Sequence, residues 1–297
     1  MQAIQVAAAT YYFDFPSIIG LYLLDDHNCC LIDSGEKIEH VQHVYACLHE
    51  RGYQVKAILS THFHPDHCSG HGWLQNRQPE CAIYATSFEA AILENPELSP
   101  FTLYTAAPPK VLQNRYLLAP PCRVTHRIKP GITRINNQEF KTVDLAGHTL
   151  GHLGWVTPDG VLFAGDSLIA PAVLASTKMN YTADVGTHIN TLNSLQTEPL
   201  AKVVSAHGGL LSDVPAAVIE NQAAVKTLLL TIQELISVGS VSLEDIMAGL
   251  FEHLDLPFNH SQYYLIRATT SACLTYLYQQ RLVATQLKSG RLLYFCQ

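Results

Sequence analysis

The chain has 297 residues, 48% of them hydrophobic, which is enough to build a core in one large domain or in a domain with a small appendage. Its net charge of -7, with only 18 Lys and Arg, disfavours nucleic acid or an anionic membrane as a main partner. The eight cysteines lack zinc-ribbon spacing, and the N-terminus lacks the pattern of a signal peptide. We therefore expect reduced thiols in a cytoplasmic protein without a membrane span.

Strands are predicted in the first 35 residues, where short apolar and β-branched runs are separated by turns. The last of these runs ends in Asp33-Ser34-Gly35. Apolar residues then recur at helical spacing from Ile38 to Arg51, and residues 57–60 form the next apolar run. This order of strand, helix and strand is typical of an α/β fold.

The next stretch, Thr61-His62-Phe63-His64-Pro65-Asp66-His67, places three imidazoles and a carboxylate in six residues. Neutral imidazole is the commonest ligand for zinc and similar ions, and a carboxylate adds an anionic oxygen. Pro65 and the preceding strand predict a loop at a strand end, where side chains can converge. The stretch therefore predicts a metal site, and the alternative is a cluster of surface histidines in a polar turn.

After this motif we predict a helix over residues 86–94 and an irregular segment over 95–130 that contains two proline pairs. That segment is either a lid or substrate wall, or a surface excursion. Strands are expected within 140–166, a helix over 184–195 and a strand over 202–206.

The pattern changes after residue 212 to three helical regions and a C-terminal hairpin that turns at Ser289-Gly290. This order is that of a winged-helix unit. Basic and acidic residues are equal in number from residue 226 onward. A unit without net charge is not expected to bind DNA. It is expected instead to pack against the rest of the chain, to close the active site, or to form a homodimer.

Three further turns place a potential ligand beside a glycine just after an apolar run: Ala146-Gly147-His148, Ala164-Gly165-Asp166 and Ala206-His207-Gly208. Strand ends at one sheet edge can direct such side chains to one spot. Each turn alone is more typical of a buried polar group or an ordinary turn. Together with the first motif, the three predict one shared site.

These motifs, in this order, resemble the metallo-β-lactamase superfamily over residues 1 to about 210. The resemblance implies an α/β fold of the αβ/βα sandwich type with two divalent metal ions at one edge. Zinc is the expected metal, and iron and manganese are the alternatives. The resemblance assigns His62, His64 and His148 to one ion, assigns Asp66, His67 and His207 to the other, and makes Asp166 the bridge. Asp33 would orient the site.

Within the superfamily, residues 147–152 and 163–168 are similar to the glyoxalase II branch. His64 disfavours the di-iron oxygen reductases, and Asp166 disfavours the true β-lactamases. His152 is interpreted as a structural residue rather than a ligand. Two features depart from the branch: Cys68 follows the motif, and the basic residues that hold glutathione have no counterpart beyond Lys178 and Tyr181, whose surroundings differ.

We therefore predict a catalytic domain over residues 1–212 and a helical, winged-helix-like domain over 213–297. The predicted function is a binuclear metal-dependent hydrolase of a small ester-like substrate, possibly a thioester as in hydroxyacylglutathione hydrolase. The expected nucleophile is a metal-bridging hydroxide, and Asp66 would hold the proton of the attacking water.

Four other functions stay open at this point. Three are enzymatic: a lactonase, a phosphodiesterase or ribonuclease, and an iron-dependent sulfur dioxygenase. The fourth is a metal-binding interaction module without catalysis. The same ligand set accepts several metals, so the sequence leaves the metal and the substrate open.

Overall fold

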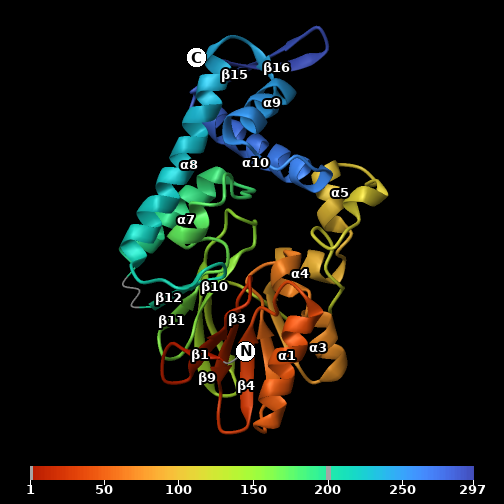
Figure 1. The fold of residues 1–297 in the computed structure, drawn as a ribbon, viewed down its shortest axis with the longest axis vertical. Helices are drawn as coiled ribbons and strands as arrows, with labels where there is room; N and C mark the ends of the chain where they lie inside the picture. Colours follow the sequence, from red (N-terminus) through yellow and green to blue (C-terminus); the bar gives the residue numbers. More distant parts are fainter. Residues whose placement is uncertain (1–2, 199–201) are drawn as a thin grey trace.

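The computed structural model describes residues 3–198 and 202–297, and its lower half is built on two β-sheets (Figure 1). The first sheet has the order β1-β2-β3-β4-β5-β6-β7, in which β1 to β4 pair antiparallel and β4 to β7 pair parallel. Its strands are Ile4–Gln5, Thr10–Phe13, Ile19–Leu23, Asn28–Ile32, Gln54–Leu59, Ala82–Thr86 and His126–Ile128.

The second sheet has the order β13-β12-β11-β10-β9-β8, and β11 and β12 form its parallel pair. In chain order, its strands are Gly131–Ile135, Gln138–Asp144, Leu153–Val156, Val161–Phe163, Lys202–Ser205 and Gly209–Leu210. The strands expected within 140–166 and over 202–206 are therefore present.

The two sheets pack against each other through a buried apolar layer. Tyr22 and Leu59 of the first sheet belong to the same buried cluster as Phe140 and Trp155 of the second. The Trp155 indole also donates a hydrogen bond of 3.0 Å to the Ser60 carbonyl oxygen, so its polar atom is satisfied inside the core. This contact ties the sheets together directly beneath the histidine motif.

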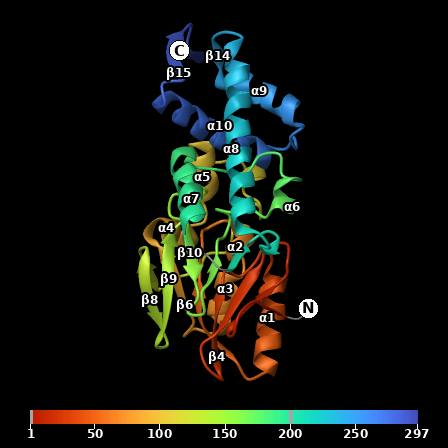
Figure 2. The same cartoon turned by 90° about the vertical axis from the view of Figure 1, so that its left-hand side faces the viewer.

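Helices cover the outer face of each sheet. On the first sheet lie α1 (Ile38–Glu50), α3 (His71–Arg77) and α4 (Ser87–Glu94), whose apolar residues share one cluster with the strands. On the second lie α7 (Val185–Thr197) and the first half of α8 (Val214–Ser237), as Figure 2 shows. The short helices are α2 (Pro65–Cys68) and α6 (Pro171–Leu174). The predicted α/β sandwich is confirmed.

The segment 95–130 is more regular than the proline pairs indicated. It contains α5 (Leu98–Tyr104), the 3-10 helix η1 (Lys110–Leu112) and strand β7. Pro100 lies in the first turn of α5, where a missing backbone N–H breaks no helical hydrogen bond. β7 forms an edge of the first sheet by pairing with β6 alone.

The C-terminal unit, residues 213–297, begins with α8, whose first half packs on the second sheet, and continues with β14 (Val241–Ser242), α9 (Leu243–Leu254), α10 (His260–Gln279), β15 (Val283–Lys288) and β16 (Arg291–Cys296). Its sheet has the order β14-β16-β15. A capping box formed by Ser242 and Asp245 starts α9. This element order fits a winged helix, which remains our proposal for the unit.

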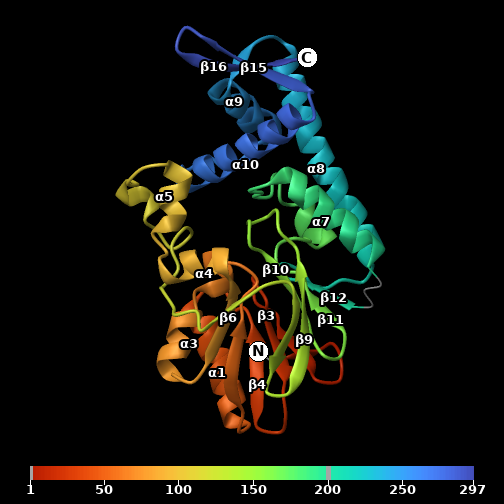
Figure 3. The same ribbon diagram turned by 180° about the vertical axis from the view of Figure 1, so that it is seen from behind.

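Helix α10 crosses from the C-terminal unit to the segment that carries α5 (Figure 3). Asn114 Nδ2 donates a hydrogen bond of 3.0 Å to Ser261 Oγ, and the rings of Tyr104 and Tyr264 lie 5.5 Å apart in an edge contact. The chain thus closes over the edge of the sandwich. None of the helices in the described ranges is both long enough and apolar enough to span a membrane.

Candidate metal centre

The predicted site residues follow the carboxyl ends of strands from both sheets and meet at one edge of the sandwich. Asp33 follows β4, the histidine motif follows β5, and the other residues follow β9, β11 and β12. Apart from Asp33, these residues form two groups, and within each group the potential ligand atoms lie within 4.8 Å of one another. The groups are His62, His64, His148 and Asp166, and Asp66, His67, Asp166 and His207.

The histidine motif is only in part the loop that its sequence predicted. Helix α2 begins at Pro65, inside the motif, because proline at the first helical position already has the required φ. The turn places Asp66 and His67 on a helix, while His62 and His64 precede it, His64 in extended backbone. This change of conformation sends the two halves of the motif to different groups.

In the first group, the ring nitrogen atoms of three histidines converge. His64 Nδ1 lies 3.1 Å from His62 Nε2 and 2.9 Å from His148 Nε2. Burial lowers the pKa of all three imidazoles, that of His64 to about 3, so the rings are neutral. Three neutral imidazoles that face one another present lone pairs to a common point, as a metal ion requires.

In the second group, carboxylates face imidazoles. His207 Nε2 lies 3.2 Å from Asp66 Oδ2 and 3.4 Å from Asp166 Oδ1. Burial opposes the charged form of His207, but the Asp166 and Asp66 carboxylates outweigh it and raise its pKa to about 10. The same carboxylates raise the pKa of His67 against its burial. The group therefore attracts positive charge, either a proton or a metal cation.

Two buried atoms at the centre have no hydrogen-bond partner: His67 Nε2 and Asp166 Oδ1, which lie 3.2 Å apart. Leaving a buried polar atom unpaired is costly, so such an atom calls for a specific explanation. A cation between the two groups would satisfy both atoms at once. The donor set of imidazoles and carboxylates fits zinc and similar divalent ions.

The outward ring nitrogens of the histidines are held by defined acceptors. Nδ1 of His148 and of His207 donates to the carbonyl oxygens of Tyr181 and Pro16, at 2.9 and 2.8 Å. His67 Nδ1 donates to Asp33 Oδ2 at 2.9 Å, and His62 Nδ1 lies 3.0 Å from Thr61 Oγ1. With these protons on Nδ1, each Nε2 presents its lone pair to the centre, which is how supporting contacts prepare metal ligands.

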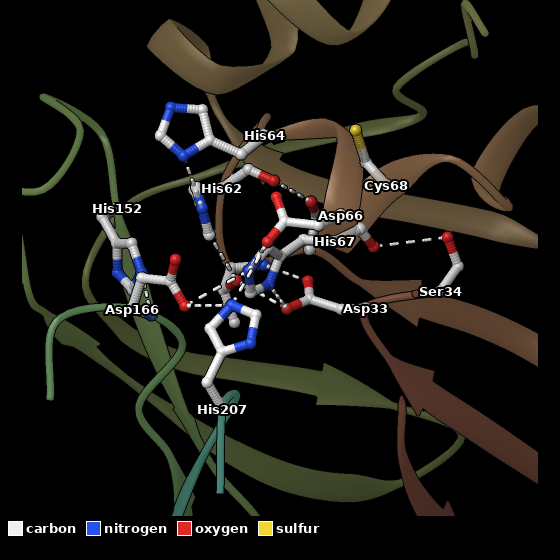
Figure 4. Close-up of polar contacts among 12 residues, drawn as sticks. Asp33, Ser34, His62, His64, Asp66, His67, Cys68, His152, Asp166 and His207 are labelled. Carbon is white, nitrogen blue, oxygen red and sulfur yellow. Dashed lines mark hydrogen bonds and ion pairs between the residues drawn. The ribbon is translucent and has the colours of Figure 1, made fainter. Parts of the chain in front are cut away.

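Asp33 belongs to neither group but lies directly behind His67 (Figure 4). Its carboxylate also accepts hydrogen bonds from Thr61 N at 2.8 Å and Thr61 Oγ1 at 2.7 Å. Its backbone has a φ of 59°, a left-handed conformation that aspartate tolerates better than most residues. Asp33 therefore joins the β4 and β5 loops and orients His67.

His152 and Cys68 stay outside both groups. His152 Nε2 accepts a hydrogen bond of 3.1 Å from Asp166 N, and its Nδ1 lies 3.1 Å from Ser167 Oγ, so it braces the loop that carries Asp166. The Cys68 thiol donates to the Phe63 carbonyl oxygen at 3.0 Å and points away from the ligands in Figure 4. All eight cysteines are unpaired.

Glu89 of α4 supports the loops that carry the grouped histidines, although no sequence motif pointed to it. Its fully buried carboxylate accepts hydrogen bonds from Phe63 N at 2.8 Å, Thr149 Oγ1 at 2.7 Å and Gly151 N at 3.0 Å. It thereby joins the loop of His62 and His64 to the loop of His148. The available signal was an acidic residue on the apolar face of a predicted helix.

A cavity of about 370 Å³ opens onto both groups. Five of the grouped residues line it, namely His64, Asp66, His148, Asp166 and His207. Its other walls come from the segment 95–130, the loop 169–181 and helix α10. The volume is in the usual range for small-molecule sites. Of the two alternatives that the sequence left open for the segment 95–130, the structure favours the wall, since residues of the segment line this cavity.

The pattern of these residues agrees with a known family. The sequence model of the metallo-beta-lactamase superfamily matches residues 21–207, which includes every predicted ligand. The chain belongs to the metallo-beta-lactamase superfamily. Membership of this family implies divalent metal ions, and the two groups of His and Asp have the donor atoms and the spacing to hold such ions.

Curated relatives of this superfamily member include hydroxyacylglutathione hydrolases. The protein of Vibrio cholerae serotype O1 is 27% identical over 184 residues, which are 61% of this chain and 58% of the relative. The protein of Haemophilus ducreyi is 25% identical over 67% of this chain and 73% of its own length. The chain thus spans little more than half the length of the first of these relatives.

Solved structures of the superfamily share the fold over almost the whole chain. A beta-lactamase domain protein from Burkholderia ambifaria has a TM-score of 0.75 at 18% identity and covers 99% of this chain and 93% of its own. A metallo-beta-lactamase family protein from Thermus thermophilus has a TM-score of 0.73 at 19% identity, with 97% and 99% covered. At these identities, the likeness concerns the fold.

Proposed function

We propose that this member of the metallo-beta-lactamase superfamily is a binuclear metal-dependent hydrolase that cleaves a small ester-like substrate such as a thioester. The observation that carries the proposal is the position of Asp166, which belongs to both ligand groups and, between them, has a buried oxygen atom that makes no hydrogen bond. Divalent ions held there would activate a water molecule and polarise a carbonyl oxygen. The hydroxyacylglutathione hydrolase relatives support the reaction class.

Asp66 is the residue to which we assign a second role, in proton transfer. Its side chain is 36% exposed and lines the cavity, whereas that of Asp166 is 10% exposed. Asp66 also contacts His207 through Oδ2 at 3.2 Å, so one oxygen can face a ligand group while the carboxylate borders the substrate space. A carboxylate in that position can orient a water molecule and hold its proton.

We infer that residues 1–212 form the catalytic unit and that residues 213–297 form a C-terminal unit that completes the cavity. Support comes from α8, which starts at Val214 after the N-cap Asp213, and from α10, which contributes Gln262, Leu265, Ile266 and Thr269 to the cavity wall. The predicted homodimer through the C-terminal unit remains a separate proposal, to be tested by sedimentation equilibrium.

The proposal is tested by metal analysis of the purified protein together with a panel of thioester, lactone and phosphodiester substrates. We expect zinc or a similar divalent ion to be bound, and thioester or ester cleavage that a chelator abolishes. Asp66→Asn should lower kcat by about 100-fold or more. The matched control is Asp26→Asn, which changes an exposed aspartate in the turn between β3 and β4.

Each alternative predicts a different result. Bound iron with oxygen uptake and no ester cleavage would identify a sulfur dioxygenase, and cleavage confined to phosphodiesters would identify a nuclease-type enzyme. An interaction module without catalysis would keep its biological activity in Asp66→Asn. The hydrolase proposal is abandoned if no ester, thioester or lactone is cleaved by protein that carries its metal.

A further inference from the structure

The cavity beside the metal centre differs in character between its floor and its walls. The floor holds five of the grouped histidines and aspartates, whereas the walls combine uncharged polar residues with apolar side chains. The apolar side chains come from three separate parts of the chain: Leu103 and Leu117 of the segment 95–130, Ile169 and Met179 of the loop after β11, and Leu265 and Ile266 of α10.

Lysine and arginine are absent from the cavity wall formed by the described residues. Lys178 lies between two wall residues, Thr177 and Met179, but its own side chain is exposed and borders a different, smaller cavity. The charged carboxylates in the wall are Asp66 and Asp166 of the metal centre itself. A substrate carboxylate or phosphate that lies away from the metal centre would therefore meet no lysine or arginine in this wall.

This absence has a direct consequence for recognition. Proteins hold carboxylates and phosphates through Arg or Lys, because an anion that loses its water needs a charged hydrogen-bond donor. Glutathione carries two carboxylates, and nucleic acid carries a phosphate at every residue. Neither has its usual recognition group in this cavity, although the curated relatives are hydrolases of glutathione thioesters by name.

The apolar wall supplies a positive criterion. Ile266 and Leu117 are almost fully buried and Leu265 is half-buried, so these side chains are held in place rather than free to move aside. The contacts between Asn114 and Ser261 and between Tyr104 and Tyr264 hold the two sides of this wall together. An acyl chain that lies along the wall would remove from water its own apolar surface and that of the half-buried Leu103, Met179 and Leu265, which favours binding.

We propose that the substrate of this site is a thioester or ester with an apolar acyl chain and an uncharged leaving group. This inference rests on the proposed hydrolase function and specifies the substrate class of the same site. In the reaction, the acyl carbon gains the oxygen of one water molecule and the carbon–sulfur or carbon–oxygen ester bond breaks. The leaving thiol or alcohol takes one proton of that water, and the other proton goes to the carboxylic acid product, which releases it at neutral pH.

A matched pair of substrates tests the charge criterion. S-octanoyl-N-acetylcysteamine and S-octanoylglutathione carry the same acyl chain on an uncharged and on an anionic thiol. We expect kcat/KM to be at least about tenfold higher for the uncharged thioester. If only the glutathione thioester is cleaved, or is cleaved faster, the inference fails while the hydrolase function stands; if neither is cleaved, the proposed function fails as well.

A chain-length series tests the apolar wall. From acetyl to butanoyl, hexanoyl and octanoyl thioesters of N-acetylcysteamine, kcat/KM should rise by up to about fourfold for each added methylene until the cavity is filled. A flat or falling series would contradict the proposed acyl position. This measurement uses the unmodified protein, so it does not depend on any variant folding correctly.

Two variants connect the preference to the wall itself. Leu265→Arg introduces a cation on α10. It should reduce cleavage of the uncharged thioester and raise cleavage of the glutathione thioester. The ratio of kcat/KM for the uncharged thioester to kcat/KM for the glutathione thioester should therefore fall at least tenfold. The control Ile132→Arg places the same charge on β8, at a residue that is 71% exposed and does not line the cavity, and should leave the ratio unchanged. An unchanged ratio in a folded Leu265→Arg protein would overturn the inference.

Discussion

Asp33 Oδ2 lies 2.9 Å from His67 Nδ1, and both side chains are buried, so the position of one imidazole depends on a carboxylate from the neighbouring strand. The same carboxylate accepts both hydrogen bonds from Thr61 at the start of the histidine motif. One residue outside the two ligand groups therefore sets the geometry of the loop that supplies four of the proposed ligands.

Replacing Asp33 should weaken metal binding without removing a ligand. Asp33→Asn keeps the shape of the side chain but places an amide N–H where Thr61 or His67 needs an acceptor. We expect the metal affinity to fall by about 10–100-fold, measured by competition with a chromogenic chelator. Asp26→Asn is the control, and an affinity equal to that of the wild type would show that Asp33 does not orient the site.

Glu89 makes the stability of the protein depend on pH. Burial outweighs its hydrogen bonds with Thr149, Phe63 and Gly151 and raises the pKa of the carboxyl group from 4.5 to about 7. The folded state therefore binds this proton more tightly than the unfolded state does. The contribution of Glu89 to the free energy of unfolding is full below pH about 4.5, and it is lost progressively as the pH rises to about 7.

This dependence can be measured against a neutral isostere. The unfolding free energy of the wild type minus that of Glu89→Gln should fall by about 3 kcal/mol from pH 4.5 to pH 7. Both values are measured in urea titrations at constant ionic strength. Glu97→Gln, at an exposed position in the same part of the chain, should show no such trend. If the wild type instead gains stability relative to Glu89→Gln as the pH rises, the pKa of Glu89 is not raised in the folded state.

Gly147 should be irreplaceable because of its surroundings as well as its backbone. Its φ is 126°, and an added Cβ would lie 2.5 Å from backbone atoms of His188. Gly131 has a similar φ of 143° but nothing within 4 Å. Gly131→Ala should cost about 1–3 kcal/mol of unfolding free energy, and Gly147→Ala about 1–3 kcal/mol more. Equal costs would show that the contact with His188 does not matter.

Tyr104 and Tyr264 should be energetically coupled, because their edge contact joins α5 to α10. A double-mutant cycle with Phe is unsuitable, since Phe keeps the ring, so each tyrosine is changed to Ala singly and together. We expect a coupling of about 0.5–1.5 kcal/mol in unfolding free energy. Tyr278→Ala, at an exposed position on the same helix, should add to Tyr104→Ala without coupling.

Sequence alone was enough to identify the ligand-type residues and to place them after strands. Motifs such as His62 to His67 combine rare residue types at short spacing, and apolar runs ahead of them mark strands, so both signals are local in the chain. The family membership and the sandwich followed from the same motifs, and both are confirmed. The order of elements in the C-terminal unit was also readable, because caps and helical spacing are local.

Only the tertiary structure determines those features of the site that require distant parts of the chain to come together. Glu89 became a support of the site only because α4 packs where the loops of Phe63 and Thr149 approach each other. The uncharged cavity wall arises because α10 and the segment 95–130 come together above the metal centre. Burial, hydrogen-bond partners and the charge of a cavity are properties of a three-dimensional arrangement, so local sequence patterns carry no direct record of them.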